Sequence, residues 1–243
     1  MTLVEFVPPK PHPLWKLCLQ MGIADVIVKV NPDLTGRSDP WTESTLREIV
    51  DTLGRAGLRV VGLEGDPFDM APVKQFGEAG ITAARREETL DHYRTLLESM
   101  AKLGIPLLCY NFMVGTGWAR TGVREGRGGA KATFFSSSLV PHPSSLNLTK
   151  DQVWANYAHF LKAVMPTAER VGVRMGLHPD DPCLPELGGY ARIFETVADY
   201  DRAYRLYPSP SNAVTYCQAN FKLMGADLVE TAKHFGHRIA FIH

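Results

Sequence analysis

The feature of this sequence that most constrains its fold is a regular alternation of short apolar runs with amphipathic segments. The apolar runs have the length and the β-branched content of buried strands. They predict six strands, at residues 23–30, 58–65, 105–113, 173–178, 212–217 and 238–243. Apolar residues at three- and four-residue spacing predict helices between them, at 42–57, 86–104, 149–171, 196–206 and 225–236. The alternation therefore indicates an α/β fold on a parallel sheet buried on both faces.

Alternation alone does not separate an open doubly wound sheet from a closed barrel. Polar residues at the carboxyl ends of the predicted strands favour the barrel, because barrel active sites lie there. These residues are Glu64, Asn111, His178, Cys217 and His243. An open sheet of this kind usually carries a glycine-rich phosphate turn, and neither GxGxxG nor GxxxxGK[ST] occurs here. We therefore predict a (β/α)8 TIM barrel.

The number of predicted strands falls short of eight. A βα unit of such a barrel takes roughly 30 residues, so six units use all 243 residues. We expect one domain over residues 1–243, a partial TIM barrel truncated after about six βα units. The alternative is a complete open fold of six units. A barrel without two strands would expose apolar edges, which natural proteins avoid, and this favours a fragment of a longer chain.

The bulk composition excludes several classes of protein. Lys and Arg number 26, as do Asp and Glu, and no basic block appears, which argues against nucleic acid or an anionic membrane as a partner. The start of the chain lacks the layout of a signal peptide, and no apolar run is long enough to span a membrane. The 4 cysteines show no CxxC spacing. They predict reduced thiols in a cytoplasmic protein.

A long stretch rich in Gly and Ser separates the third predicted strand from its helix, at about residues 114–148. Loops of this length inside a compact domain are usually functional or disordered. Because the stretch follows the carboxyl end of a strand, we predict a lid over the catalytic face.

Three residues carry the strongest chemical signal: His178 in HPDDP, Cys217 in TYCQAN and His243 in RIAFIH. Each follows a predicted strand, so a barrel would bring them to one point. Imidazole and thiolate are ligands for transition metals, and the three together predict a metal site. Asp180 and Asp181 offer a hydrogen-bond partner for the His178 imidazole. Taken alone, the HPDDP motif also fits a solvated polar turn. Cys217 taken alone also fits a buried, unreactive thiol.

A second group is predicted to bind substrate. Asn111 can exchange hydrogen bonds with a polyol, and Arg120 suits bidentate capture of a carboxylate. Trp118 and Tyr110 are candidates for the floor of a sugar-binding pocket, although aromatic residues near strand ends more often pack in the core. Glu64 is a further hydrogen-bonding group or a simple turn residue. Asp180 completes the set. The run RREE at residues 85–88 is interpreted as a solvated helix start.

These motifs, in their order and approximate spacing, resemble the mannonate dehydratase family. The resemblance rests on LCYNFM, the following W-x-R-T, HPDDP, Cys217 and RIAFIH, and it runs from about residue 20 to the end. It implies a xylose-isomerase-like TIM barrel that dehydrates D-mannonate to 2-keto-3-deoxy-D-gluconate. It also implies a divalent metal, Mn²⁺ or Fe²⁺ with Mg²⁺ or Co²⁺ as alternatives, held by His, Cys, His and Asp.

The first three of those ligands match His178, Cys217 and His243. The fourth, and the residues for proton transfer, are expected beyond His243. The chain departs from the family pattern at Gly117, where an Asp usually precedes the Trp, and at 218–220, where the family usually reads TGS. These departures bear on the substrate more than on the metal.

The function expected from these residues is a hydro-lyase reaction on a small sugar acid, in a chain that can form a homo-oligomer. A bound metal would act as Lewis acid, with Asn111 and Arg120 orienting the substrate. Two alternatives stay open: a metal-dependent sugar isomerase or epimerase on the same architecture, and an inactive fragment or binding module. A carboxylate-rich ligand set would be more typical of the isomerase.

Overall fold

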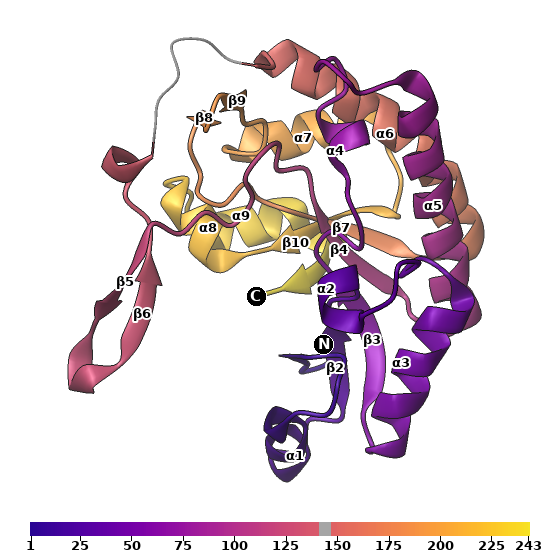
Figure 1. Cartoon of the computed structure of the whole chain (residues 1–243). Coiled ribbons are helices and arrows are strands. Elements are labelled where there is room, and N and C mark those ends of the chain that lie inside the picture. The colour runs from indigo at the N-terminus through magenta and orange to yellow at the C-terminus, as the bar shows by residue number, and fades with distance from the viewer. Residues whose placement is uncertain (141–146) are drawn as a thin grey trace.

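The computed structural model describes residues 1–140 and 147–243. Its centre is a curved sheet in which neighbouring strands pair in parallel and follow the order of the chain. Within the described ranges the sheet has seven strands: β1 (Glu5–Val7), β2 (Asp25–Val28), β3 (Arg59–Glu64), β4 (Leu107–Asn111), β7 (Arg174–His178), β10 (Asn212–Tyr216) and β11 (Ile239–Ile242). This is the wall of a TIM-barrel-like fold (Figure 1).

All six predicted strands are present, and within the described residues the sheet has one further strand that was not predicted. The additional strand, β1, pairs with β2 from Glu5 to Val7. Sequence reasoning missed it because three residues in a proline-rich segment are too few to show a period.

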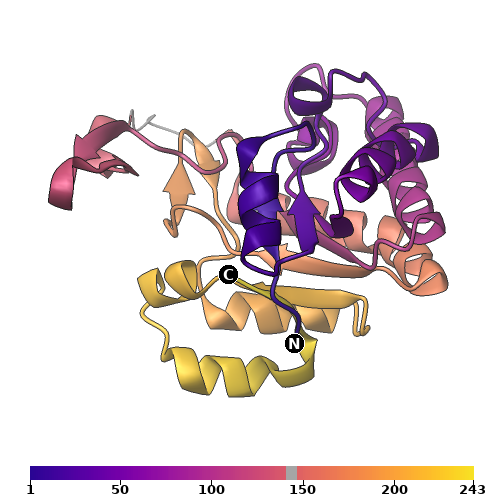
Figure 2. The ribbon, with the colours of Figure 1, turned by 90° about the horizontal axis from the view of Figure 1, so that it is seen from below.

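Helices surround the outer face of the curved sheet (Figures 1 and 2). The five predicted helices correspond to α3 (Glu43–Arg55), α5 (Ala83–Lys102), α6 (Lys150–Val171), α7 (Val197–Leu206) and α9 (Leu228–Phe235). The described residues also form helices that were not predicted: α1 (Pro13–Gln20), α2 (Pro32–Thr35), α4 (Ala71–Lys74) and α8 (Gln218–Leu223). They span eight residues or fewer, so they display at most two helical turns.

An aromatic layer fills the space between the sheet and helix α6. Tyr110 on β4 is 2% exposed, and its hydroxyl lies 2.9 Å from that of Tyr157 on α6. The Tyr110 ring also packs against Phe160 at a centroid distance of 5.7 Å. Tyr110 is therefore part of the core and does not floor a sugar pocket. Thr149 precedes α6 and forms a capping box with Gln152, which stabilises the start of the predicted helix.

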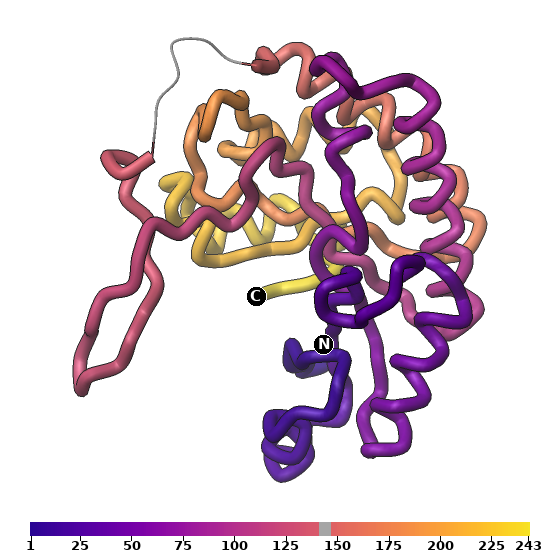
Figure 3. Tube along the Cα trace, in the orientation of Figure 1, coloured from indigo at the N-terminus to yellow at the C-terminus, as the bar shows by residue number. Residues whose placement is uncertain are grey.

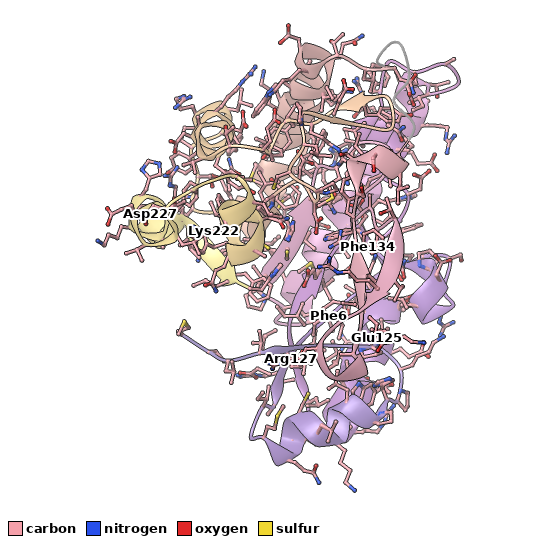
Figure 4. The ribbon with its side chains drawn as sticks, turned by 90° about the vertical axis from the view of Figure 1, so that its left-hand side faces the viewer. Phe6, Glu125, Arg127, Phe134, Lys222 and Asp227 are labelled. Carbon is pink, nitrogen blue, oxygen red and sulfur yellow. The ribbon has the colours of Figure 1, made fainter. Side chains whose placement is uncertain are left out.

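The stretch predicted as a lid contains an antiparallel hairpin, β5 (Gly122–Glu125) with β6 (Lys131–Phe134). The Phe134 ring lies over Gly122, where an added Cβ would come within 2.8 Å of it. The hairpin projects from the body of the molecule, with Phe134 near its base and Glu125 near its tip (Figures 1 and 4). Residues 141–146 of the predicted lid lie outside the described residues. A second small hairpin joins β8 (Glu186–Leu187) to β9 (Tyr190–Ala191).

None of the helices in the described residues is both long enough and apolar enough to cross a membrane. The longest of these helices, α6, carries charged residues at both ends, including Asp151 in its first turn and Arg170 in its last.

Candidate metal centre

Polar side chains gather at the carboxyl-terminal edge of the parallel sheet. Asn111 and His178 end the neighbouring strands β4 and β7 and stand directly opposite each other in the register. His243 follows β11 and lies near the middle of the molecule (Figure 3). Its backbone N–H donates to the Tyr216 carbonyl at 3.2 Å, and its carbonyl accepts from Gln218 N at 2.8 Å. These two bonds place His243 beside Cys217.

The donor atoms of His178, Cys217 and His243 lie within 4.8 Å of one another. Neighbouring ligands of a tetrahedral ion, at about 2.1 and 2.3 Å, stand about 3.6 Å apart. The three side chains would therefore hold a single divalent cation after their donor atoms move closer by up to about 1 Å. The two imidazole rings stack with centroids 5.0 Å apart and planes 23° apart. The predicted convergence of these residues is present.

The orientation of His178 leaves one ring nitrogen free for a cation. Its Nδ1 lies 2.7 Å from the Pro179 carbonyl oxygen, which only accepts, so Nδ1 carries the proton. Burial, with a smaller contribution from His243, lowers the pKa of His178 to about 4. The ring is therefore neutral at pH 7, with the Nε2 lone pair available. The partner of Nδ1 is the Pro179 carbonyl, so the predicted bond to Asp180 or Asp181 is wrong.

Cys217 lies at the start of a short helix, as the N-cap residue of α8. Burial raises the pKa of its thiol, whereas the backbone N–H groups of Asn220 and Ala219 lower it. Without a cation the thiol keeps its proton at neutral pH. A divalent ion beside it would favour the thiolate, which is the form that coordinates.

A second group of three shares His243 with the first. Ligand atoms of Glu64, Cys109 and His243 also lie within 4.8 Å of one another. Burial raises the pKa of the Cys109 thiol well above its usual range and also raises that of Glu64. The Cys109 Sγ is 3.2 Å from the Thr215 hydroxyl, which also lies 3.0 Å from the Gly176 carbonyl oxygen in the sheet and donates to it. Cys109 was not predicted as a ligand, because a lone cysteine inside a strand usually indicates a packed thiol.

An experiment can distinguish the two candidate ligand groups, because each contains a different cysteine. Co²⁺ bound to a thiolate gives a charge-transfer absorption band in the near ultraviolet. We expect this band to disappear in Cys217→Ser and to persist in Cys109→Ser, because the first group combines two neutral imidazoles with the less buried thiol. Titration of both variants with Co²⁺, followed by absorption spectroscopy, measures the difference. The reverse pattern would place the ion in the Glu64 group.

Asn111 is held from inside the protein by a buried lysine. Its Oδ1 accepts from Lys74 Nζ at 2.9 Å and from Met113 N at 3.0 Å. Lys74 is 3% exposed and also donates to Asp66 at 2.6 Å. Burial lowers the pKa of Lys74, and Asp66 opposes this shift. The Asn111 Nδ2 is buried and has no partner in the described part of the chain. Lys74 and Asp66 were not predicted, since a lysine and an aspartate outside the predicted strands usually face solvent.

Trp118 lies over the candidate centre. It is a non-glycine residue in the left-handed region, with φ of 47°. Its ring is 5.7 Å from that of His178, at an interplanar angle of 54°. Arg120, two residues later, binds Asp181 through both guanidinium nitrogens, at 2.9 and 3.0 Å. The carboxylate that Arg120 holds is thus supplied by the protein itself.

Asp180 has a different role from the one predicted. It is 1% exposed, and its Oδ1 pairs with Arg192 at 3.3 Å in an equally buried ion pair. Its Oδ2 accepts from the backbone N–H groups of Ile193 and Phe194, at 3.1 and 2.8 Å. The geometry does not support a substrate-binding role, because all of these contacts lie inside the fold.

The chain matches a family model described as D-mannonate dehydratase over residues 19–151 and 145–243. A mannonate dehydratase of Enterococcus faecalis is 28% identical over 91% of this chain and 70% of its own length. Among solved structures, the mannonate dehydratase of Streptococcus suis serotype 2 aligns over 100% of this chain and 71% of its own, with a TM-score of 0.85 and 25% identity.

A xylose isomerase domain protein of Planctomyces limnophilus aligns over 99% of the chain at 13% identity, with a TM-score of 0.54, which is a likeness of fold alone. The chain spans 60 to 70% of the length of the curated relatives that it matches first.

Proposed function

This chain belongs to the D-mannonate dehydratase family, and from that premise we propose that it dehydrates a sugar acid with the help of a divalent metal. The substrate is D-mannonate, the product 2-keto-3-deoxy-D-gluconate, and the metal Mn²⁺ or Fe²⁺. The observation that carries the proposal is the convergence of His178, Cys217 and His243 at the edge of the sheet where barrel enzymes bind substrate.

The donor set suits such an ion. Two imidazoles that are neutral at pH 7 and one thiol near a helix start are borderline-soft ligands, which suit Fe²⁺ and Zn²⁺, whereas Mn²⁺ prefers oxygen ligands. His178, Cys217 and His243 would hold it. When bound, it supplies Lewis-acid stabilisation for negative charge that develops next to the substrate carboxylate.

Side chains of the chain would supply further parts of the reaction. Elimination of water transfers a proton from the carbon beside the carboxylate to a general base, and the hydroxyl on the next carbon leaves as water after protonation by a general acid. Glu64 has a carboxyl group whose pKa burial raises, so it retains a proton at higher pH than an exposed carboxyl. It lies 3.7 Å from His243 and could protonate the departing hydroxyl. Trp118 would exclude water from one side, and Asn111 would bind a substrate hydroxyl.

The proposal is tested by incubating the Mn²⁺-loaded protein with D-mannonate. We expect 2-keto-3-deoxy-D-gluconate to form, as detected by proton NMR, with turnover lost on chelation by EDTA and restored by added Mn²⁺. Neutral ketoses such as D-fructose serve as the control for an isomerase. Turnover of the ketose without turnover of D-mannonate would replace the proposed reaction with the isomerase alternative.

A further inference from the structure

Two cationic side chains lie beside the candidate metal centre, and they differ in what they already bind. The charge of Arg120 is balanced by its bidentate pair with Asp181. Lys29 follows β2 directly, at the same carboxyl-terminal edge of the sheet as the metal ligands. Its ammonium makes no hydrogen bond and no ion pair within 4.0 Å across residues 1–140 and 147–243. Within these residues, Lys29 is thus a cation at this edge that remains available for a ligand.

The position of the Lys29 side chain is fixed by two neighbours. Its stem passes over Gly65, where an added Cβ would lie 3.3 Å from Lys29 Cε and 3.6 Å from Nζ. Gly65 has a φ of 86° and follows Glu64, which faces His243. On the other side, Lys29 Nζ lies 5.8 Å from the centre of the Trp118 ring, which in turn lies 5.7 Å from the ring of His178. Lys29 and His178 therefore both border Trp118.

These neighbours do not satisfy the positive charge. A centroid distance of 5.8 Å is at the outer limit of about 6 Å for a cation–π contact, so Trp118 contributes little. Glu64 follows the neighbouring strand, but in the described residues no hydrogen bond and no ion pair within 4.0 Å joins its carboxyl group to Lys29. A half-buried ammonium without an anion has lost part of its hydration and gains strongly from a charge-assisted hydrogen bond.

We propose that Lys29 binds the carboxylate of the sugar-acid substrate, at the edge of the Trp118 ring that Lys29 shares with the metal ligand His178. The inference rests on the proposed function for the class of ligand. It assigns to Lys29 the selection of acids over neutral sugars, a role that the sequence had suggested for Arg120. Because a charge-assisted hydrogen bond contributes roughly 1.5–3 kcal/mol, its loss corresponds to a factor of about 10 to 100 in affinity.

The test measures binding of two ligands by isothermal titration to the Mn²⁺-loaded protein. D-mannonate carries the carboxylate, and D-mannonamide has the same hydroxyl groups without the charge. We expect Lys29→Met to raise the Kd for D-mannonate about 10- to 100-fold and that for D-mannonamide less than about 3-fold. Lys29→Arg restores most of the affinity for D-mannonate. Lys162→Met removes the same charge from the exposed face of α6 and should leave the Kd for both ligands unchanged.

If Lys29→Met weakens binding of D-mannonate and D-mannonamide equally, or does not weaken binding of D-mannonate, the proposed role of Lys29 is wrong. A wild-type protein that binds D-mannonate without dehydrating it would refute the proposed reaction, whereas the comparison of acid with amide would still decide on Lys29. A wild-type protein that binds neither ligand would refute both. If the protein turns over D-mannonate, Lys29→Met should raise KM by the same factor with a smaller change in kcat.

Discussion

His178→Ala is expected to weaken binding of Mn²⁺ by more than about 100-fold and to reduce dehydration to background at metal concentrations that saturate the wild type. The substitution removes one of the three candidate ligands in the described residues and leaves Cys217 and His243. It also opens the site to water, because the ring is 2% exposed and lies under Trp118. Equilibrium dialysis against Mn²⁺ measures the affinity, and the NMR assay measures turnover.

The matched control is His159→Ala. His159 is a half-exposed residue of α6 that contacts Glu87 on the surface, so its loss should change neither metal binding nor turnover. Circular dichroism on both variants checks that the fold is retained. Unchanged Mn²⁺ affinity in a folded His178→Ala protein would remove His178 from the metal site.

The second large effect is on stability, for Asp180→Ala. We expect the free energy of unfolding to fall by about 3–5 kcal/mol, because the substitution leaves the Arg192 guanidinium buried without a counter-charge. Arg192 would keep the Thr116 carbonyl as acceptor, while its Nε has no partner in the described part of the chain even before the change. The backbone N–H groups of Ile193 and Phe194 also lose their acceptor. For a chain of this size the loss corresponds to a fall in Tm of roughly 6–20 °C.

Urea denaturation followed by circular dichroism measures the change. Asp181→Ala is the matched control, since Asp181 pairs with a partly exposed Arg120, and exposed ion pairs contribute about 1 kcal/mol or less. In the double variant Asp180→Leu with Arg192→Met, part of the stability should return, because neither charge of the pair is left buried. A loss below about 1 kcal/mol in Asp180→Ala would contradict the buried-pair interpretation.

The strands and the meeting of three ligands could be predicted from the sequence for a simple physical reason. Buried parallel strands are continuous apolar runs, and their carboxyl ends lie at one edge whatever the details of packing. His178, Cys217 and His243 were therefore recognisable from their places after such runs. Strand β1 could not be recognised from the sequence, because its three residues are too few to show an alternating pattern.

The roles of the surrounding polar residues depend on partners that are distant in the sequence. Asp180 and Asp181 are adjacent and chemically identical, yet one is buried with Arg192 and the other binds Arg120, 61 residues away. Lys74 meets Asn111 across 37 residues, and Thr215 meets Cys109 across 106. Local patterns carry no information on such contacts, so sequence reasoning placed Asp180 and Arg120 at the substrate and missed Lys74 and Lys29.

The most direct test of the metal centre is an anomalous difference map from crystals of the protein grown with Mn²⁺. The arrangement of donor atoms predicts one strong peak within about 2.0–2.4 Å of His178 Nε2, Cys217 Sγ and a ring nitrogen of His243. A peak bonded instead to Glu64 and Cys109, or no peak at this edge of the sheet at saturating Mn²⁺, would contradict it.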